Sequence, residues 1–124
     1  MIQKLINKLI NTVREFADLR PDNVYKLSND SIHCQYIAGT CSDGSIGCIF
    51  GQAFKELGLD WGEYGDTHAC YGTISALVQH FCGCGDHNIL NWLDCVQVLQ
   101  DMGHEWKNVV NEADLKYPLE VNDV

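Results

Sequence analysis

The sequence contains only two prolines and few basic residues, and it lacks any long run of apolar residues. A membrane-spanning helix needs about 18 or more consecutive apolar residues, so we expect no transmembrane segment. The scarcity of proline, together with 46% hydrophobic and 10% aromatic residues, excludes a disordered or polyproline chain. At 124 residues the chain has the length of one ordinary domain, which we expect over residues 1–117, with a loose tail over 118–124.

Basic side chains are outnumbered, with 8 lysines and arginines against 17 aspartates and glutamates and a formal net charge of −9. Residues 1–20 carry four basic and two acidic side chains, so the rest of the chain, with four basic and fifteen acidic ones, carries −11. Such a surface repels phosphate backbones and disfavours direct nucleic-acid binding. It favours a basic protein partner, although the same acidity is typical of a protein that only needs to stay soluble.

The N-terminus lacks the uninterrupted apolar stretch of a signal peptide, because polar residues interrupt MIQKLINKLINTVREF every two or three positions. We therefore expect a cytoplasmic protein that does not use a membrane. Disulfides are rare in that compartment, so the seven cysteines are expected to be reduced thiols, with metal binding as the next interpretation.

Apolar residues recur at three- and four-residue steps along most of the chain, which predicts amphipathic helices. Turn residues surround the short apolar segment 32–38 and predict one small hairpin, while the glycine-broken segment 60–72 is expected to be a loop. The prediction is a mainly α, compact single domain of about five helices with at most a small two-stranded β ribbon. The apolar stripes of the expected helices run over residues 2–16, 46–57, 74–81, 89–102 and 106–113.

A dense group of thiols and imidazoles lies in the segment HFCGCGDH. Zinc prefers four tetrahedral ligands of these types, and the candidates are His80, Cys82, Cys84 and His87. The Cys-x-Cys spacing is tighter than in ordinary zinc knuckles, so the alternative is small thiols that fill the core beside surface histidines. We accordingly expect either no cofactor or one structural zinc.

Cys48 follows the turn SDGSIG and falls in the first turn of an expected helix, where the helix dipole can activate a thiol. A cysteine hydrolase also needs an oriented imidazole, and no signature selects one among the five histidines. Cys48 is therefore the candidate nucleophile of a thiol-dependent enzyme, and the alternative is a small residue packed beside Gly47 and Gly51. Because no complete catalytic set is present, we expect binding rather than catalysis.

Two segments are candidates for ligand binding. The glycines around the helix that begins after residue 46 can expose N–H groups to an anion, or they can simply permit a tight turn. The rings of the segment 60–72 can form a recognition surface, or they can cover the core. The candidate binding residues are Tyr36, Gly47, Cys48, Gln52, Trp61, Tyr64 and Tyr71.

The segments CQYIAGTCSDGSIGCIFGQAFKELGLD and VQVLQDMGHEWKNVVNEAD resemble a family of small proteins encoded by phages and prophages of actinobacteria. The resemblance implies a phage origin but no particular chemistry, and the thiols and imidazoles between residues 68 and 87 depart from the family pattern. The positions that carry it are Cys34, Tyr36, Gly47, Cys48, Gly51, Gln52, Leu57, Gly58, Val96, Gln97, Gln100, Asp101, Gly103 and Trp106.

These observations predict a phage-encoded accessory or host-interaction protein, with counter-defence as one role of that kind. It is expected to act in the host cytoplasm by binding a host protein, of basic character if the charge is used, or a small ligand. The sequence leaves an oligomer open. The alternatives are a thiol-dependent enzyme built on Cys48 and a zinc-stapled structural module.

Overall fold

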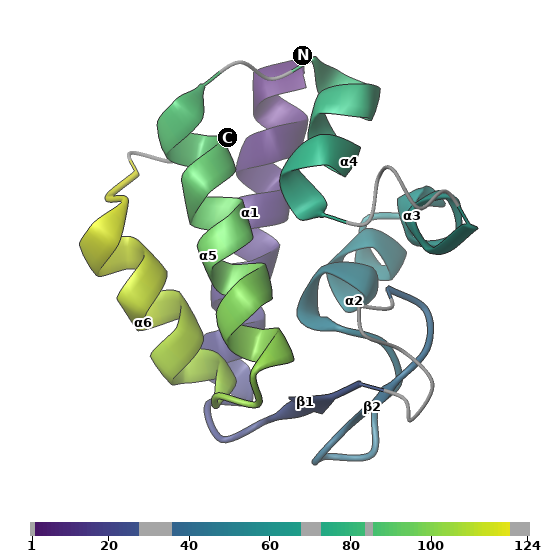
Figure 1. Ribbon diagram of the computed structural model, residues 1–124, viewed down its shortest axis with the longest axis vertical. Helices are drawn as coiled ribbons and strands as arrows, with labels where there is room; N and C mark the ends of the chain where they lie inside the picture. The colour runs from purple at the N-terminus through teal and green to yellow at the C-terminus, as the bar shows by residue number, and fades with distance from the viewer. Residues whose placement is uncertain (1, 28–35, 68–72, 84–85, 120–124) are drawn as a thin grey trace.

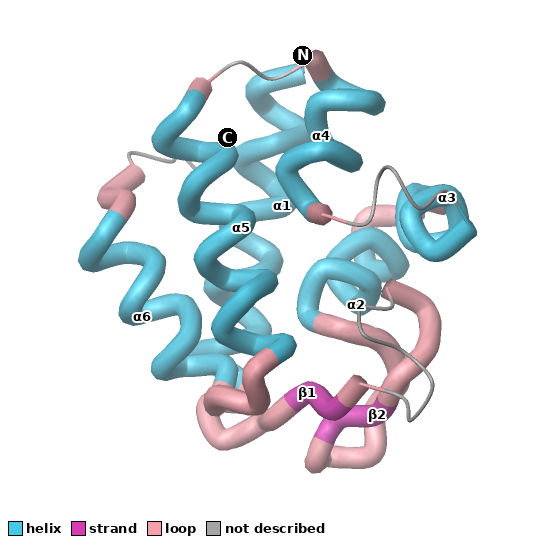
Figure 2. Tube along the Cα trace, in the orientation of Figure 1, coloured by secondary structure: helices cyan, strands magenta, loops and turns pink. Residues whose placement is uncertain are grey.

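The computed structural model describes residues 2–27, 36–67, 73–83 and 86–119, which form six helices and one small antiparallel sheet (Figure 1). Strands β1 (Tyr25–Lys26) and β2 (Thr40–Cys41) pair with Tyr25 opposite Cys41 (Figure 2). The expected mainly α domain with a two-stranded ribbon is confirmed. Within the described ranges, none of the helices combines the length and the apolar character needed to cross a bilayer. The helices are α1 (Ile2–Leu19), α2 (Ile49–Glu56), α3 (Trp61–Thr67), α4 (Ile74–Cys82), α5 (His87–Asp101) and α6 (Trp106–Lys116).

Helix α1 forms because its apolar residues return to one face every three or four positions. That face is completely buried at Leu9, Ile10 and Val13. The helix ends at Leu19, before the Arg20–Pro21 pair, since proline disfavours the helical conformation in the residue that precedes it. Helix α1 packs against α2 and α6 and lies behind α5 in Figure 1.

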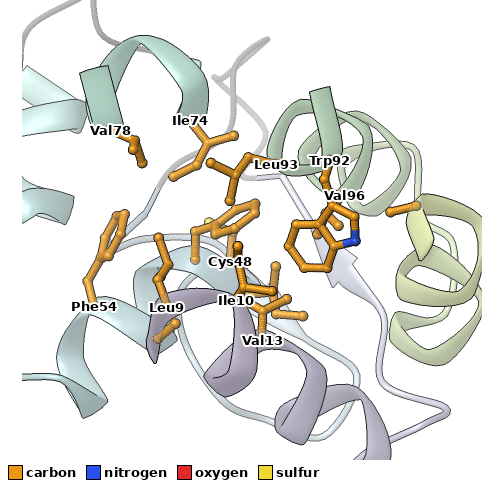
Figure 3. Close-up of a cluster of buried hydrophobic side chains, with 14 of the residues drawn as sticks. Leu9, Ile10, Val13, Cys48, Phe54, Ile74, Val78, Trp92, Leu93 and Val96 are labelled. Carbon is orange, nitrogen blue, oxygen red and sulfur yellow. The ribbon is translucent and has the colours of Figure 1, made fainter. Parts of the chain in front are cut away.

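Side chains from several helices meet in one apolar core (Figure 3). Helix α1 contributes its buried stripe, α4 contributes Ile74 and Val78, and α5 contributes Trp92, whose ring is completely buried. The indole nitrogen of Trp92 donates to the Asp114 carboxylate at 2.8 Å, and Arg14 donates to the same oxygen at 2.7 Å. One carboxylate on α6 therefore satisfies a core indole and pairs with α1, which fixes α1, α5 and α6 relative to one another.

The sequence prediction was wrong for residues 61–67, which form helix α3 and not part of a loop. Glycine in a helix interior costs about 1 kcal/mol relative to alanine, so Gly62 and Gly65 argue locally against a helix. Both glycines are buried, and a Cβ on Gly65 would lie 2.7 Å from the Tyr36 ring. The helix exists because tertiary contacts at the glycines outweigh their poor local propensity, which raises the expected number of about five helices to six.

Tyr36 fills the space that the glycines leave. Its side chain is 1% exposed, and its backbone lies so close to α2 that a Cβ on Gly51 would be 1.5 Å from the Tyr36 carbonyl oxygen. The Asp66 carboxylate on α3 accepts hydrogen bonds from the backbone N–H groups of Tyr36 at 2.8 Å and of Ile37 at 3.0 Å. The segment can pack directly on α2 because Gly51 has no side chain, and the Asp66 carboxylate binds the segment to α3.

Two buried glutamines on α5 accept hydrogen bonds from the N-terminal N–H groups of two other helices. The Gln97 side chain accepts from the N–H of Ile74 at 2.7 Å and donates to the Tyr36 hydroxyl at 2.9 Å. The Gln100 side chain accepts from the N–H of Ile49 at 3.2 Å. The first N–H groups of a helix have no partner within the helix, so these amides satisfy donors of α4 and α2 that burial would otherwise leave unpaired.

The close contact between Gly51 and the Tyr36 backbone predicts that one added methyl group strongly destabilises the protein. Gly51→Ala is expected to lower the free energy of unfolding by about 3 kcal/mol or more, because the new Cβ collides with backbone and not with a side chain that could rotate away. Glu56→Ala, at an exposed position of the same helix, should change it by less than about 0.5 kcal/mol. Chemical denaturation followed by circular dichroism measures both, and equal stabilities would contradict the close approach.

Replacing a buried glutamine with an apolar residue of similar size should lower the free energy of unfolding, because a hydrogen bond is lost while the volume is kept. Gln100→Met keeps the approximate size of the side chain but leaves the Ile49 N–H without its acceptor, so unfolding should become easier by about 1–3 kcal/mol. The matched control is Gln79→Met on the exposed face of α4, for which a change within about 0.5 kcal/mol is expected. A Gln100 variant as stable as this control would show that the amide does not support α2.

Candidate functional site

A tight turn places helices α2 and α3 side by side. Gly58 has a φ of +72°, and the N–H of Leu59 donates to the carbonyl of Phe54 at 2.8 Å, which is the pattern of a Schellman turn. The chain reverses directly after α2, and α3 packs back against it. The Tyr36–Ile37 segment then lies against both helices.

A hollow of about 520 Å³ opens between α2, α3 and the Tyr36–Ile37 segment, and we call it the α2–α3 hollow. Buried residues, among them Phe54 and Gly62, form its floor. Its rim is apolar at Ile37 and Ile46, which are 53% and 67% exposed. Large exposed apolar side chains beside a concave apolar floor are typical of a surface that binds a partner.

Charged side chains complete the rim of the hollow. Asp60 and Glu63 lie on the α3 side, and Lys55 lies near the end of α2. All three are exposed, and none of them forms an ion pair with another residue of the described ranges. The rim therefore presents two carboxylates and one ammonium group whose charge is not compensated within the described part of the chain.

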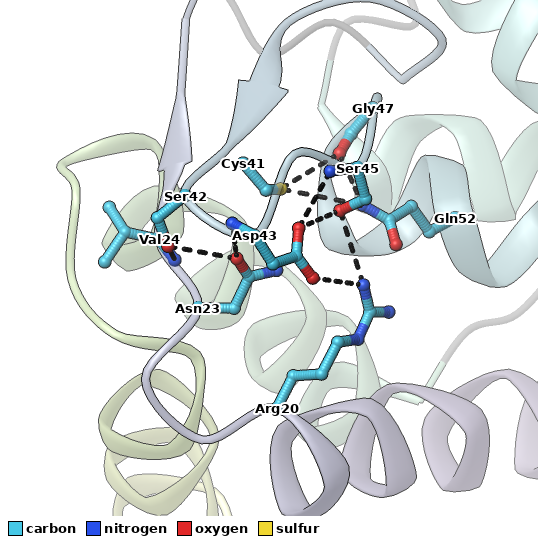
Figure 4. Close-up of polar contacts among 9 residues, drawn as sticks. All are labelled: Arg20, Asn23, Val24, Cys41, Ser42, Asp43, Ser45, Gly47 and Gln52. Atoms are coloured by element: carbon cyan, nitrogen blue, oxygen red, sulfur yellow. Dashed lines mark hydrogen bonds and ion pairs between the residues drawn. The ribbon is translucent and has the colours of Figure 1, made fainter.

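A polar network holds the turn that carries Ile46 (Figure 4). Arg20 donates to the Asp43 carboxylate at 2.9 Å, and Gln52 donates to the Ser45 hydroxyl at 2.9 Å and to the Gly47 carbonyl at 3.0 Å. Burial raises the pKa of the Asp43 carboxyl, but hydrogen bonds from Ser45 and the charge of Arg20 outweigh it, so the pKa lies below its usual value. The network fixes one wall of the hollow to the end of α1.

A second concave surface, of about 690 Å³, adjoins the α2–α3 hollow on the side of α1. Phe16 and Arg20 line it, and the Arg20 guanidinium lies 4.9 Å from the centre of the Phe16 ring. Ile46, Gln52 and Lys55 line both concave surfaces. The exposed face of α2 therefore forms a ridge between two adjoining depressions.

An anion site at the start of α2 was one of two interpretations of the sequence, and here the protein's own side chains accept from two of its N–H groups. Gln100 accepts from the N–H of Ile49, and the Cys48 sulfur accepts from the N–H of Gly51 at 3.4 Å. Gly47 has a φ of +96°, which suits the interpretation of a tight turn. Among the predicted binding residues of this segment, Tyr36 and Gln52 reach the α2–α3 hollow, whereas Gly47 and Cys48 do not line it.

The aromatic residues of α3 pack inward against α4. Trp61 is 7% exposed and stacks in parallel on Phe81, with ring centres 4.9 Å apart. Tyr64 is half-buried and stacks on His80 at 4.8 Å. These two rings cover the core, which was the alternative to an exposed recognition loop, because their side chains are spaced to share one face of α3. Tyr71 lies outside the described residues.

The described residues do not gather the proposed zinc ligands. His80 is exposed beside Tyr64, Cys82 is buried at the end of α4, and His87 is exposed at the start of α5. Cys84 lies outside the described residues. No group of three potential ligands occurs within the described ranges, so the zinc site stays a prediction from the sequence alone.

The thiols near α2 are enclosed by the fold. Cys48 is 0% exposed and its sulfur caps α2, while Cys41 donates to the Gly47 carbonyl at 3.5 Å. Burial raises the pKa of the Cys41 thiol, and the nearby Asp43 carboxylate adds to the increase. A nucleophile must be reachable by its substrate, and both thiols are buried, so this geometry favours capping and packing over catalysis. Cys34, which belongs with Cys48 to the pattern of the sequence resemblance, lies outside the described residues.

Sequence reasoning missed most of the rim. Ile46 was assigned to the buried face of a helix, and Ile37, Lys55, Asp60 and Glu63 were not singled out. Lysine, aspartate and glutamate are common on protein surfaces and isoleucine is usually buried, so no local pattern marks these residues as one rim. They become a site only because a turn and a close backbone approach bring three segments of the chain together.

The burial of the thiols predicts slow alkylation. With iodoacetamide at neutral pH, Cys48 and Cys41 of the native protein should react at least about tenfold more slowly than the partly exposed Cys95, and all three should react at similar rates in denaturant. Peptide mass mapping at several times resolves the sites. Rapid labelling of Cys48 in the native protein would instead restore the thiol-dependent enzyme.

Compared with models of protein families, with curated proteins and with solved structures, the chain matches none of them. The resemblance to phage-encoded proteins therefore stays a prediction from the sequence. Several positions that carry it have structural roles here, since Gly51 admits Tyr36 and both Gln97 and Gln100 close helix starts. The function has to be argued from the surface of this chain.

Proposed function

We propose that the chain is a phage-encoded accessory protein that acts in the host cytoplasm by binding a basic host protein, and that it is not an enzyme. The α2–α3 hollow is the observation that carries this proposal. It combines a concave apolar floor with two exposed isoleucines, Ile37 and Ile46, at its rim. Apolar side chains in that position gain free energy when a partner removes them from water.

The charge of the chain supports a basic partner. The net charge is −9, and Asp60 and Glu63 place two carboxylates at the rim of the hollow. Complementary charge accelerates encounter and suppresses association with acidic competitors. The carboxylates at the rim of the hollow and the net negative charge of the protein therefore both favour a basic partner.

A protein partner fits this site better than a small ligand. A small-molecule site usually encloses most of its ligand, whereas the isoleucines at this rim project into solvent and adjoin the second depression across α2. A contact that covers the rim and both depressions needs a surface larger than one small molecule.

The proposal is tested with a partner captured from an actinobacterial lysate, identified and then purified. We expect it to be basic, and its dissociation constant should rise by about tenfold or more between low and high salt, because the attraction of exposed charges is screened. Ile46→Ser should weaken binding by about tenfold through the loss of apolar contact. Isothermal titration calorimetry measures both effects.

The control variant is Val98→Ser, which removes a similarly exposed apolar side chain from α5, on another part of the molecule. It should bind as tightly as the unmodified protein. Binding that does not weaken with salt, binding that does not weaken on Ile46→Ser, or a partner that is acidic would each contradict the proposal.

A further inference from the structure

We infer that the α2–α3 hollow accepts an arginine side chain that stands next to an apolar residue in an exposed segment of the partner. This inference rests on the proposed function, since it names the chemistry of the group that enters the same site.

The apolar part of the hollow fits a long aliphatic stem. Phe54 and Gly62 form part of a buried floor, and Ile37 and Ile46 stand above it. Gly62 lets Tyr36 and Ile37 pack closely on α3, because a Cβ there would lie only 3.1 Å from the side chains of both. A volume of about 520 Å³ has room for more than one side chain, so an apolar neighbour can enter beside the stem.

The charged part of the rim fits a cation. Asp60 and Glu63 are three positions apart at the start of α3, both line the hollow, and neither forms an ion pair within the described ranges. Lys55 lies on the α2 side and repels a second cation there. A ligand is therefore oriented with its positive end toward α3 and its apolar part toward the isoleucines.

Among cationic side chains, arginine suits this arrangement best. Its planar guanidinium carries five donors in a fork that can meet two carboxylates at once, whereas lysine offers one compact and strongly hydrated charge. Its methylene stem also covers apolar surface while the charged end stays near water. Both requirements are met at one side chain, which is why arginine is common among the dominant residues of protein interfaces.

The test uses two capped dipeptides that differ in charge and hardly in shape, acetyl-Leu-Arg-amide and acetyl-Leu-citrulline-amide. Each is titrated into ¹⁵N-labelled protein and followed by two-dimensional NMR, which detects millimolar binding. We expect the arginine peptide to shift the amide signals of Ile37, Gly51 and Gly62 and to bind about fivefold more tightly than the citrulline peptide, as two partly exposed ion pairs allow. The amides of Val98 on α5 and of Met102 directly after α5 should not shift.

The matched variant is Asp60→Asn combined with Glu63→Gln. Both side chains are exposed and without an ion pair in the described ranges, so the variant should give the spectrum of a folded protein. In it the two peptides should bind with nearly equal affinity, because the charge-dependent part of the preference is gone while the apolar contacts remain. A purely structural role of the carboxylates would weaken both peptides alike and would overturn the inference.

Other occupants give distinct results. Equal affinity of the two peptides for the unmodified protein, or signals that shift elsewhere, would overturn the arginine assignment. Concentration-dependent shifts at the hollow without peptide would assign it to a second copy of the chain. An organic adduct in native mass spectrometry that is lost on Ile46→Ser would assign it to a small ligand. These results concern the arginine assignment alone, because the host partner is tested separately by the salt dependence of its binding. If Ile46→Ser does not weaken binding of the host partner, both proposals are wrong.

Discussion

The close approach of Tyr36 to helices α2 and α3 is the constraint on which the rest of the candidate site depends. Its backbone occupies the place of a side chain at Gly51, its ring occupies the place of one at Gly65, and its hydroxyl is held by Gln97. Asp66 holds its N–H group from α3. One residue thus joins α2, α3 and α5, and the hollow beside it owes its shape to close-packed backbone, which is harder to deform than a loop.

The polar groups inside the core have a related effect. Buried amides are costly when unpaired, so Gln97 and Gln100 favour the arrangement in which the starts of α4 and α2 face them. A shift of either helix along its axis would leave both an N–H donor and an amide oxygen without partners. These contacts therefore determine where α2 and α4 begin more strictly than apolar packing does, and α2 is one wall of the hollow.

The residues that carry the sequence resemblance and the residues that form the rim are largely different sets. Gly51, Gln97 and Gln100 serve the internal contacts, while Asp60 and Ile46 lie at the surface. A pattern of this kind describes how a chain folds and says little about what it binds. The proposals for function therefore rest on the residues of the rim and not on the pattern.

The sequence by itself determined the helical class, the amphipathic stripe of α1 and the stop at Pro21, because three- and four-residue periodicity and the geometry of proline act locally. It also determined the net charge of −9, on which the proposal of a basic partner rests. It could not reveal α3, whose glycines oppose a helix until Tyr36 packs on them, nor the inward packing of Trp61. The hollow itself was decided only by the tertiary structure, because Ile37, Ile46 and the residues from 51 to 63 come from segments that meet only in the folded chain, and contacts between such segments leave no periodic signal in the sequence.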